Sequence, residues 1–361
     1  MSILLIGNSG LKANLKDGQT LKLRLYKKKI VDEGYSASFI DLENFLHHPF
    51  SILSKIKKEL KICDKVVLIS GERACKLLIP FINKHNKRKI PFVLPIVGSG
   101  VLHFSIDHLS KEDQLSFMID GNYQLGKENK KIEKELKKID FILPETELLK
   151  KVYSEYYHLD NCYVLNNFRD YEERKDFHHI VNEPIRLIFL SRVMRLKGIF
   201  ELMDAIKDLN KEKTICKLDI YGDIDMSEED KLLLTKILDD NITYKGSIDN
   251  NEVIDTISEY DLFVFPTNAV YEGTPGVIVE SLIAGVPVLS SNFPQAKYLL
   301  KDGYDSILYE MFSKDDLKEK IIYCLNNRVL LQNMRKNALE SGNKYLYKHE
   351  REKFLKSICG K

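Results

Sequence analysis

One segment, residues 261–289, constrains this chain more than any other. An apolar run from Leu262 to Phe265 predicts a buried strand, and an apolar helical pattern follows the turn that comes after it. Gly273 and Gly276 permit backbone conformations that are closed to other residues, so a ligand can approach the main chain. The N–H groups at the helix start favour an anion. The segment therefore predicts an anion-binding turn between a strand and a helix.

Two carboxylates flank this turn. Glu272 precedes the glycines, and Glu280 is expected near the first turn of the helix. A charged carboxylate can accept hydrogen bonds from sugar hydroxyls, each worth roughly 1.5–3 kcal/mol. The alternative is ordinary structure, because a glutamate in a first helical turn can cap the helix and Gly-Pro clusters form turns. For Glu280 alone both interpretations stay open, whereas the whole segment favours a ligand site.

The length of 361 residues predicts two domains. Short apolar runs alternate with helical patterns, which predicts parallel sheets covered on both faces. A polar stretch at 167–184 marks a boundary, so we expect domains at 1–168 and 169–340, with a C-terminal helix at 341–361 packing back on the first. The expected fold is α/β, with two Rossmann-like doubly wound domains facing across a cleft. Expected strands are Ile3–Ile6, Ser38–Ile40, Val66–Ile69, Phe92–Pro95, Phe141–Leu143, Tyr163–Leu165, Arg186–Leu190, Lys217–Tyr221, Ile242–Tyr244, Leu262–Phe265 and Val286–Leu289.

Several classes of protein are disfavoured by the composition. No run of eighteen apolar residues is present, so no membrane span is expected, and the N-terminus is expected to form a first strand and not a signal peptide. The 6 cysteines are scattered without a CxxC pair, which indicates reduced thiols in a cytoplasm.

Charge is balanced overall but unevenly distributed. Residues 1–168 carry 27 Lys+Arg against 20 Asp+Glu, and the remainder carries 28 against 33. A basic first half could face anionic lipid, nucleic acid or an acidic substrate, or it could simply have lysine-rich solvated helices. The densest basic clusters are residues 55–61 and 84–89.

A second motif, residues 191–198, follows the expected strand that ends at Leu190. Arg192 and Lys197 lie on one loop, which ends at Gly198. Arginine offers a planar fork for phosphate oxygens and lysine a compact point charge, so the loop could clamp a diphosphate. A basic loop taken alone is usually solvated surface. This loop, however, follows a strand and lies in the same half of the chain as the Glu272 segment, which favours binding of a diphosphate.

With these motifs the chain resembles retaining glycosyltransferases of the two-Rossmann-domain (GT-B) fold, specifically the large family 4 group. The matching residues are Arg192, Lys197 and Gly198; Glu272 and Glu280; the run Ala284, Gly285, Pro287 and Val288; and Gly222 and Gly246. The resemblance is strong over about residues 186–310. The sequence departs from the family pattern at Ser191, where a glycine is usual, and at Pro275, which has no N–H to donate.

The resemblance implies roles for these residues. Arg192 and Lys197 would bind the donor diphosphate, Glu280 the ribose hydroxyls, and Glu272 the donor sugar near its reacting ring. The pocket would be lined by the backbone of Gly273, Thr274, Gly276 and Val277. The segment after Gly246 would contact the nucleotide base. By the same resemblance no metal or other cofactor is needed, and the nucleotide-diphosphate sugar, of UDP or GDP type, is a substrate.

The first half is expected to bind the acceptor. Gly18 and Gln19, before a helix, fit a loop close to the donor phosphates, although a plain strand–helix connection explains them too. His103 is a candidate near the reacting carbon, by resemblance, with a structural histidine as the alternative. The expected acceptor is a glycan or a lipid-linked glycan for a surface polysaccharide. We expect no nucleic-acid partner. We do expect peripheral contact with the inner face of the membrane through the basic first half.

Other functions stay open at this stage. An Asp-x-Asp at Asp223 and Asp225 could bind a divalent metal, but the following Ser227-Glu-Glu-Asp230 pattern favours a capping loop. A nucleotide-sugar 2-epimerase or a glycan phosphorylase would use the same fold, and a non-catalytic nucleotide-sugar-binding protein would keep the binding residues without turnover.

Overall fold

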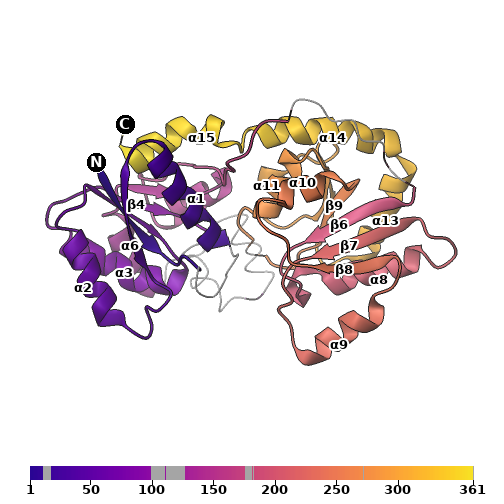
Figure 1. Cartoon of the computed structure of the whole chain (residues 1–361), viewed down its shortest axis with the longest axis horizontal. Coiled ribbons are helices and arrows are strands. Elements are labelled where there is room, and N and C mark those ends of the chain that lie inside the picture. The colour runs from indigo at the N-terminus through magenta and orange to yellow at the C-terminus, as the bar shows by residue number, and fades with distance from the viewer. Residues whose placement is uncertain are drawn as a thin grey trace. The chain divides into compact units, whose positions relative to one another are not determined.

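The computed structural model divides the chain into two compact units. Residues 1–170 and 350–361 form the first unit, and residues 171–349 form the second (Figure 1). The structure describes residues 1–10, 18–98, 110, 127–174, 181, 183–270 and 272–360. The sequence-based boundaries, 168/169 and 340/341, lie two and nine residues before the boundaries of these units at 170/171 and 349/350.

The first unit is built on a five-stranded sheet in the order β2-β1-β3-β4-β5, whose strand pairs are parallel. Because parallel strands are buried on both faces, they are almost continuously apolar; β1, for example, is buried from Ile3 to Gly7. The strands are β1 (Ser2–Gly7), β2 (Ser36–Asp41), β3 (Lys65–Ile69), β4 (Phe92–Pro95) and β5 (Phe141–Leu143).

Helices alternate with these strands as right-handed crossover connections require. One core cluster unites the sheet with apolar residues of α2, α3, α6 and α7, for example Ile56 and Leu78. Helix α1 packs against β1, β2 and β3. The helices are α1 (Gly18–Asp32), α2 (Pro49–Glu59), α3 (Glu72–His85), α6 (Lys127–Leu136) and α7 (Glu147–Tyr156).

The second unit is built on a six-stranded sheet in the order β11-β10-β9-β6-β7-β8, again with parallel pairs. Its two faces support separate core clusters, one that includes α8, α13 and α14, and one that includes α10, α11 and α12. The strands are β6 (Ile185–Leu190), β7 (Cys216–Tyr221), β8 (Ile242–Gly246), β9 (Leu262–Phe265), β10 (Val288–Ser291) and β11 (Ser306–Tyr309).

The helices of the second unit connect these strands and cover the sheet. They are α8 (Ile199–Leu209), α9 (Glu228–Ile237), α10 (Val253–Ser258), α11 (Gly276–Ile283), α12 (Ala296–Leu299), α13 (Lys314–Asn326) and α14 (Arg328–Asn343). Two doubly wound parallel sheets confirm the expected pair of Rossmann-like domains.

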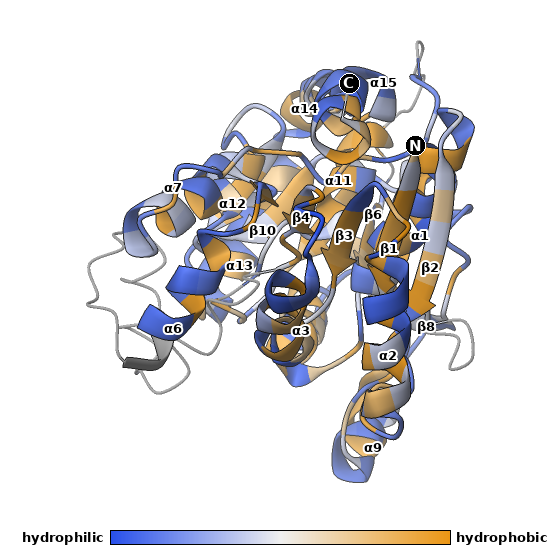
Figure 2. Cartoon of the chain, turned by 90° about the vertical axis from the view of Figure 1, so that its left-hand side faces the viewer, coloured by the Kyte–Doolittle hydropathy of each residue, from blue (hydrophilic) through white to orange (hydrophobic). Residues whose placement is uncertain are grey.

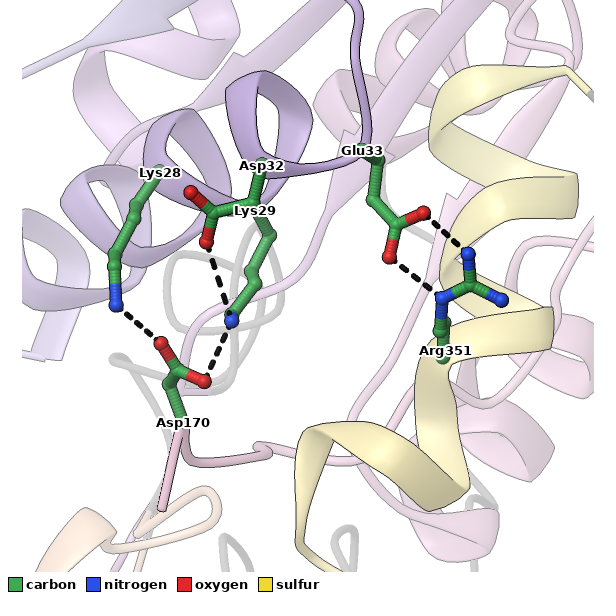
Figure 3. A network of polar contacts seen from close by, with 6 residues as sticks. All are labelled: Lys28, Lys29, Asp32, Glu33, Asp170 and Arg351. Atoms are coloured by element: carbon green, nitrogen blue, oxygen red, sulfur yellow. Dashed lines mark hydrogen bonds and ion pairs between the residues drawn. The ribbon is translucent and has the colours of Figure 1, made fainter. Parts of the chain in front are cut away.

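Helix α1 and Glu33, the residue directly after it, bind both segments at which the chain passes between the units (Figure 3). Asp170, the last residue of the first crossing, is ion-paired with Lys28 and Lys29. Arg351, just after the second crossing, forms a two-pronged pair with Glu33, with N···O distances of 2.6 Å. A bidentate arginine–carboxylate pair adds geometric specificity to charge. The returning C-terminal segment is therefore anchored to α1 within the first unit.

The C-terminal segment differs from the single helix expected at residues 341–361. It consists of α14, α15 (Tyr347–Phe354) and a π-helical stretch, Leu355–Cys359. Phe354 packs edge-on against Tyr26 and Phe168, whose rings stack on each other with centroids 5.6 Å apart. Aromatic packing thus fixes α15 on the first unit.

One expected strand was wrong, one begins later than expected, and one was missed. Residues 163–165 form no strand; Tyr163 N–H only donates to Ile142 O, at 2.9 Å, beside an isolated bridge. The strand expected at 286–289 begins later, at Val288, because Gly285 turns the chain at φ 71°. The edge strand β11 was missed because its tetrapeptide carries little pattern.

Candidate functional site

The strand order of the second sheet reverses at β6, which has β7 on one side and β9 on the other. In open parallel sheets, ligands bind outside the carboxyl ends of the strands at such a switch point. The two sequence motifs are the segments that follow β6 and β9, so both emerge at this point. The topology therefore brings together what the sequence places about eighty residues apart.

The segment after β6 is pressed onto the segment after β9. It closes with a 3₁₀ turn, Arg195–Lys197, followed by Gly198 at φ 71°. A Cβ at Gly198 would lie 1.8 Å from the Pro266 carbonyl oxygen, so only glycine fits. Asn268 N–H donates to Leu196 O at 2.9 Å and joins the two segments further.

The side chains of Lys197 and Glu272 meet in this contact. They form an ion pair, and each side chain is only 13% exposed. Thr267 Oγ donates to Glu272 Oε1 at 2.8 Å, and Lys197 Nζ lies 5.5 Å from the centroid of the Phe265 ring. Two residues predicted to act at one site are therefore adjacent. Charges this shielded from water act more strongly than exposed ones.

Arg192 lies on the other side of the same loop. Its guanidinium pairs with Asp225 at 3.3 Å, and the two side chains are 63% and 57% exposed. An exposed pair of this kind is worth about 0–1 kcal/mol, so an anionic ligand can replace Asp225 at little cost. Asp225 belongs to the Asp-x-Asp sequence, and Ser227 after it caps α9 by accepting from Asp230 N–H at 3.2 Å. The capping role expected for this loop is confirmed.

Helix α11 begins at Gly276, with Pro275 as its N-cap and no side-chain cap. Hydrogen bonding of the helix starts with Ile278 N–H, 3.1 Å from Pro275 O, so the N–H groups of Gly276 and Val277 precede it at the positive end of the dipole. Gly273 and Thr274 are buried just before the helix. Glu280, expected near the first turn, is the fifth helical residue and lies in the second turn, half-buried.

The predicted glycines at the ends of β7 and β8 bond to each other. Gly222 N–H donates to Gly246 O at 2.9 Å, and Gly246 ends β8 at φ 81°. A Cβ at Gly222 would lie 1.8 Å from Ser191 O, so Gly222 packs directly beneath the Arg192 loop. Gly246 is therefore linked through Gly222 to the loop that carries the cations.

The candidates of the first half lie in the other unit. Gly18 and Gln19 begin α1, and the Gln19 side-chain nitrogen lies 3.1 Å from where a Cβ of Gly71 would stand. Gly71 follows β3, and the strand order of this sheet reverses at β1, between β2 and β3. His103 lies outside the described residues.

Sequence reasoning missed the polar residues that support Glu272. Thr267 is fully buried; besides its bond to Glu272, its Oγ accepts from Ala269 N–H at 3.2 Å, and its carbonyl accepts from Ser291 Oγ at 2.7 Å. A buried hydroxyl two residues after a strand at a switch point is the signal that could have identified Thr267.

Within the ranges that the structure covers, no group of three or more His, Cys, Asp or Glu side chains is arranged to hold a metal ion. Over the same ranges, every helix is too short or too polar to cross a membrane.

These observations define a class. The second unit is a doubly wound parallel sheet whose switch point carries a lysine, an arginine and a helix start without a side-chain cap, which is an arrangement suited to binding an anion. The family described as "Glycosyl transferases group 1" matches residues 170–341, so this part of the chain belongs to that family.

Proteins with similar sequences include several that are named as glycosyltransferases. An uncharacterized glycosyltransferase of Methanocaldococcus jannaschii, MJ1178, is 27% identical over 158 residues, covering 44% of this chain and 43% of that protein. The capsular polysaccharide biosynthesis glycosyltransferase CapM of Staphylococcus aureus is 27% identical over 166 residues, covering 45% and 42%. The chain thus spans less than half the length of each of these relatives.

Solved structures share the fold. Anabaena Alr3699/HepE, crystallised in complex with UDP and glucose, superposes with a TM-score of 0.74 at 15% identity, with 100% of both chains covered. A sucrose-phosphate synthase of Thermosynechococcus elongatus gives 0.73 at 14% identity, covering 98% of this chain and 97% of that one. The chain therefore has the GT-B architecture that its sequence predicted.

Proposed function

We propose that the protein is a hexosyltransferase-type glycosyltransferase that moves a sugar from a nucleotide-diphosphate sugar to a hydroxyl of an acceptor. The observation that carries the proposal is the Lys197–Glu272 pair, which joins the loop after β6 to the start of α11 at the switch point. A cation and a helix N-terminus can neutralise a diphosphate there, and a carboxylate beside them can bind the sugar.

In the proposed reaction, negative charge develops on the departing diphosphate, and the positively charged groups of the site stabilise it there. The bond from the anomeric carbon to the diphosphate breaks, and Arg192, Lys197 and the N–H groups of Gly276 and Val277 stabilise the departing anion. Stabilisation of this kind lowers the transition state more than the ground state. The acceptor oxygen bonds to the same face of the sugar, and a diphosphate oxygen takes its proton, so the configuration is retained.

Each remaining residue has a proposed task. Glu272, paired with Lys197 and oriented by Thr267, contacts the donor sugar, and Glu280 holds the ribose hydroxyls. Gly273, Thr274 and the segment after Gly246 line the donor site. Gly18 and Gln19 are assigned to the donor phosphates and His103 to the reacting carbon, and no metal is required.

The donor is proposed to be a UDP or GDP sugar, and the acceptor a glycan or lipid-linked glycan of a surface polysaccharide. Support comes from the capsular relative CapM, and from HepE, whose crystals hold UDP and glucose. The six free, buried thiols agree with the reducing cytoplasm where we place the enzyme, in peripheral contact with the inner face of the membrane.

A thermal-shift panel of nucleotides and nucleotide sugars tests the proposal, because a ligand that binds only the folded state stabilises it by mass action. One base and one sugar are expected to give the largest shift, and the selected donor is then incubated with glycan acceptors. The anomeric configuration of the product, measured by proton NMR, tests retention. A panel without any stabilising nucleotide would contradict the proposal.

A further inference from the structure

The two densest basic clusters of the sequence, residues 55–61 and 84–89, are brought together in the first unit. Arg88, in the loop after α3, donates to the carbonyl oxygens of Lys61 and Cys63, at 3.1 and 2.6 Å, at the end of α2. Helices α2 and α3 pack against each other. Neither cluster takes part in the site described above, which lies in the second unit.

The solvent-facing side of α2 is cationic. Ile52, Ile56 and Leu60 face the core, so the opposite face contains Phe50, Ser54, Lys57 and Lys61 at spacings of four and three. The exposed cations of the joined clusters are Lys55, Lys57, Lys58, Lys61, Lys84, Lys87, Arg88 and Lys89. Within residues 46–62 and 84–89, Glu59 is the one acidic residue, and Asp64, just beyond them, lies 3.9 Å from Arg88, so cations still outnumber acidic groups on this surface. This surface therefore attracts anions.

Large apolar side chains stand exposed beside these cations. Leu46 and Phe50, just before and at the start of α2, are each 86% exposed. Ile62, which directly follows Lys61, is also exposed, at 68%. Scattered apolar residues on a surface need no explanation, but here they border one basic patch. Figure 2 shows hydrophobic and hydrophilic segments mixed along α2.

We propose that this basic–apolar surface, formed by residues 46–62 of α2 and its flanks and by residues 84–89 at and after the end of α3, docks on a membrane containing anionic lipid. Lysines approach the headgroups while Leu46 and Phe50 enter the interface, which is the two-signal combination that membrane binding needs. A soluble polyanion would use the lysines but gain nothing from the two apolar side chains. The inference specifies the membrane contact proposed above and does not depend on sugar transfer.

The test is co-sedimentation of the full chain, without any donor, with phosphatidylcholine vesicles that lack or contain about one third phosphatidylglycerol. Binding is expected only to the anionic vesicles and is expected to be lost at about 0.5 M NaCl, where charges are screened. Lys57→Glu with Lys58→Glu, and separately Leu46→Ser with Phe50→Ser, should each weaken binding at least about tenfold.

The matched control is α9 in the second unit, which exposes Leu232 and Lys236 but has Glu228, Glu229 and Asp230 in its first turn. Leu232→Ser with Lys236→Glu should bind vesicles as the unchanged protein does. The proposal is overturned if anionic vesicles are not bound, or if the control variant weakens binding equally. It is also overturned if Leu46→Ser with Phe50→Ser binds normally, which would indicate a surface for a soluble polyanion.

Discussion

At the scale of single residues, the proposed donor site consists of side chains that also bind each other. Lys197 forms an ion pair with Glu272, and Arg192 forms one with Asp225. The two pairs differ in burial, so they should respond differently to a ligand. The shielded Lys197–Glu272 pair is preorganised and need not open, because an ammonium has three donors. The exposed Arg192–Asp225 pair must exchange partners.

That exchange makes a testable prediction. Arg192→Ala should weaken nucleoside diphosphate binding about tenfold, because a charge-assisted hydrogen bond is lost. Asp225→Asn should leave binding unchanged or strengthen it slightly, since it removes only a competing carboxylate. Calorimetric titration measures both. Weaker binding by Asp225→Asn would mean that this carboxylate belongs to the ligand site and not to a resting partner of Arg192.

Residue roles were predicted where the sequence shows a local motif, and missed where contacts are distant in sequence. Glu272 and Lys197 were found because each lies in a recognisable strand–loop segment. Thr267 was not, since its role appears only when Glu272 folds back toward it. Likewise, nothing in the sequence signals that Lys22 and Glu145, 123 positions apart, form a buried ion pair at 2.6 Å.

At the scale of elements, the geometry of the site depends on the turn between β6 and α8. Gly198 has a left-handed conformation and lies against the Pro266 carbonyl, and this contact sets the position of Lys197 beside Glu272. Strand positions were predicted well here: β9, β4 and β5 match residue for residue, because buried parallel strands are short apolar runs. Loop contacts such as this one cannot be read from periodicity.

Two glycine substitutions distinguish the energetic cost of a left-handed φ angle from the cost of a steric clash. Gly198→Ala should lower the free energy of unfolding by about 2 kcal/mol or more, since it combines a left-handed φ with a clash against backbone. Gly246→Ala has the same kind of φ but nothing within 4 Å of the added Cβ, so about 1 kcal/mol is expected. Urea denaturation measures both, and equal losses would show that contact with Pro266 is unimportant.

The cysteines make a prediction about the cores of the two sheets. All six are free and buried, and burial raises the pKa of Cys75 and Cys216 to about 12. Since the thiolate is the reactive form, alkylation of the native protein at pH 8 should be at least about a hundredfold slower than in urea. Mass spectrometry measures the labelling of each thiol. Rapid labelling of either thiol in the native protein would show that the core around it opens readily.

At the scale of the whole molecule, each unit is a complete doubly wound sheet, and the chain passes between them at two places. The alternation of strands and helices was enough to predict this architecture. The strand orders, and with them the switch point that unites the two motifs, could not be predicted, because register and neighbour choice depend on contacts between distant segments.

The anchoring of the first crossing should depend on pH. Burial raises the pKa of Asp170, but hydrogen bonds from Lys28 and Lys29 outweigh it, so the pKa is lowered overall. A lowered carboxylate pKa contributes stability above the unfolded pKa of about 3.9, and that stability is lost as pH falls through the folded pKa.

Asp170→Asn should therefore lower the free energy of unfolding by about 1 kcal/mol at neutral pH, with the difference vanishing in strong acid. Urea denaturation across pH measures it, with Asp160→Asn as an exposed control in the same unit. A loss that is independent of pH would mean that Asp170 acts through packing and not through its charge.

The central claim is that Lys197, paired with Glu272 at the switch point of the second sheet, binds the diphosphate of the donor. Calorimetric titration of Lys197→Met with the nucleoside diphosphate preferred by the unchanged protein tests it most directly. The dissociation constant should rise about tenfold to a hundredfold, whereas Lys207→Met, which removes a surface pair with Asp239, should leave it unchanged. An unaltered dissociation constant for a folded Lys197→Met protein would contradict the account.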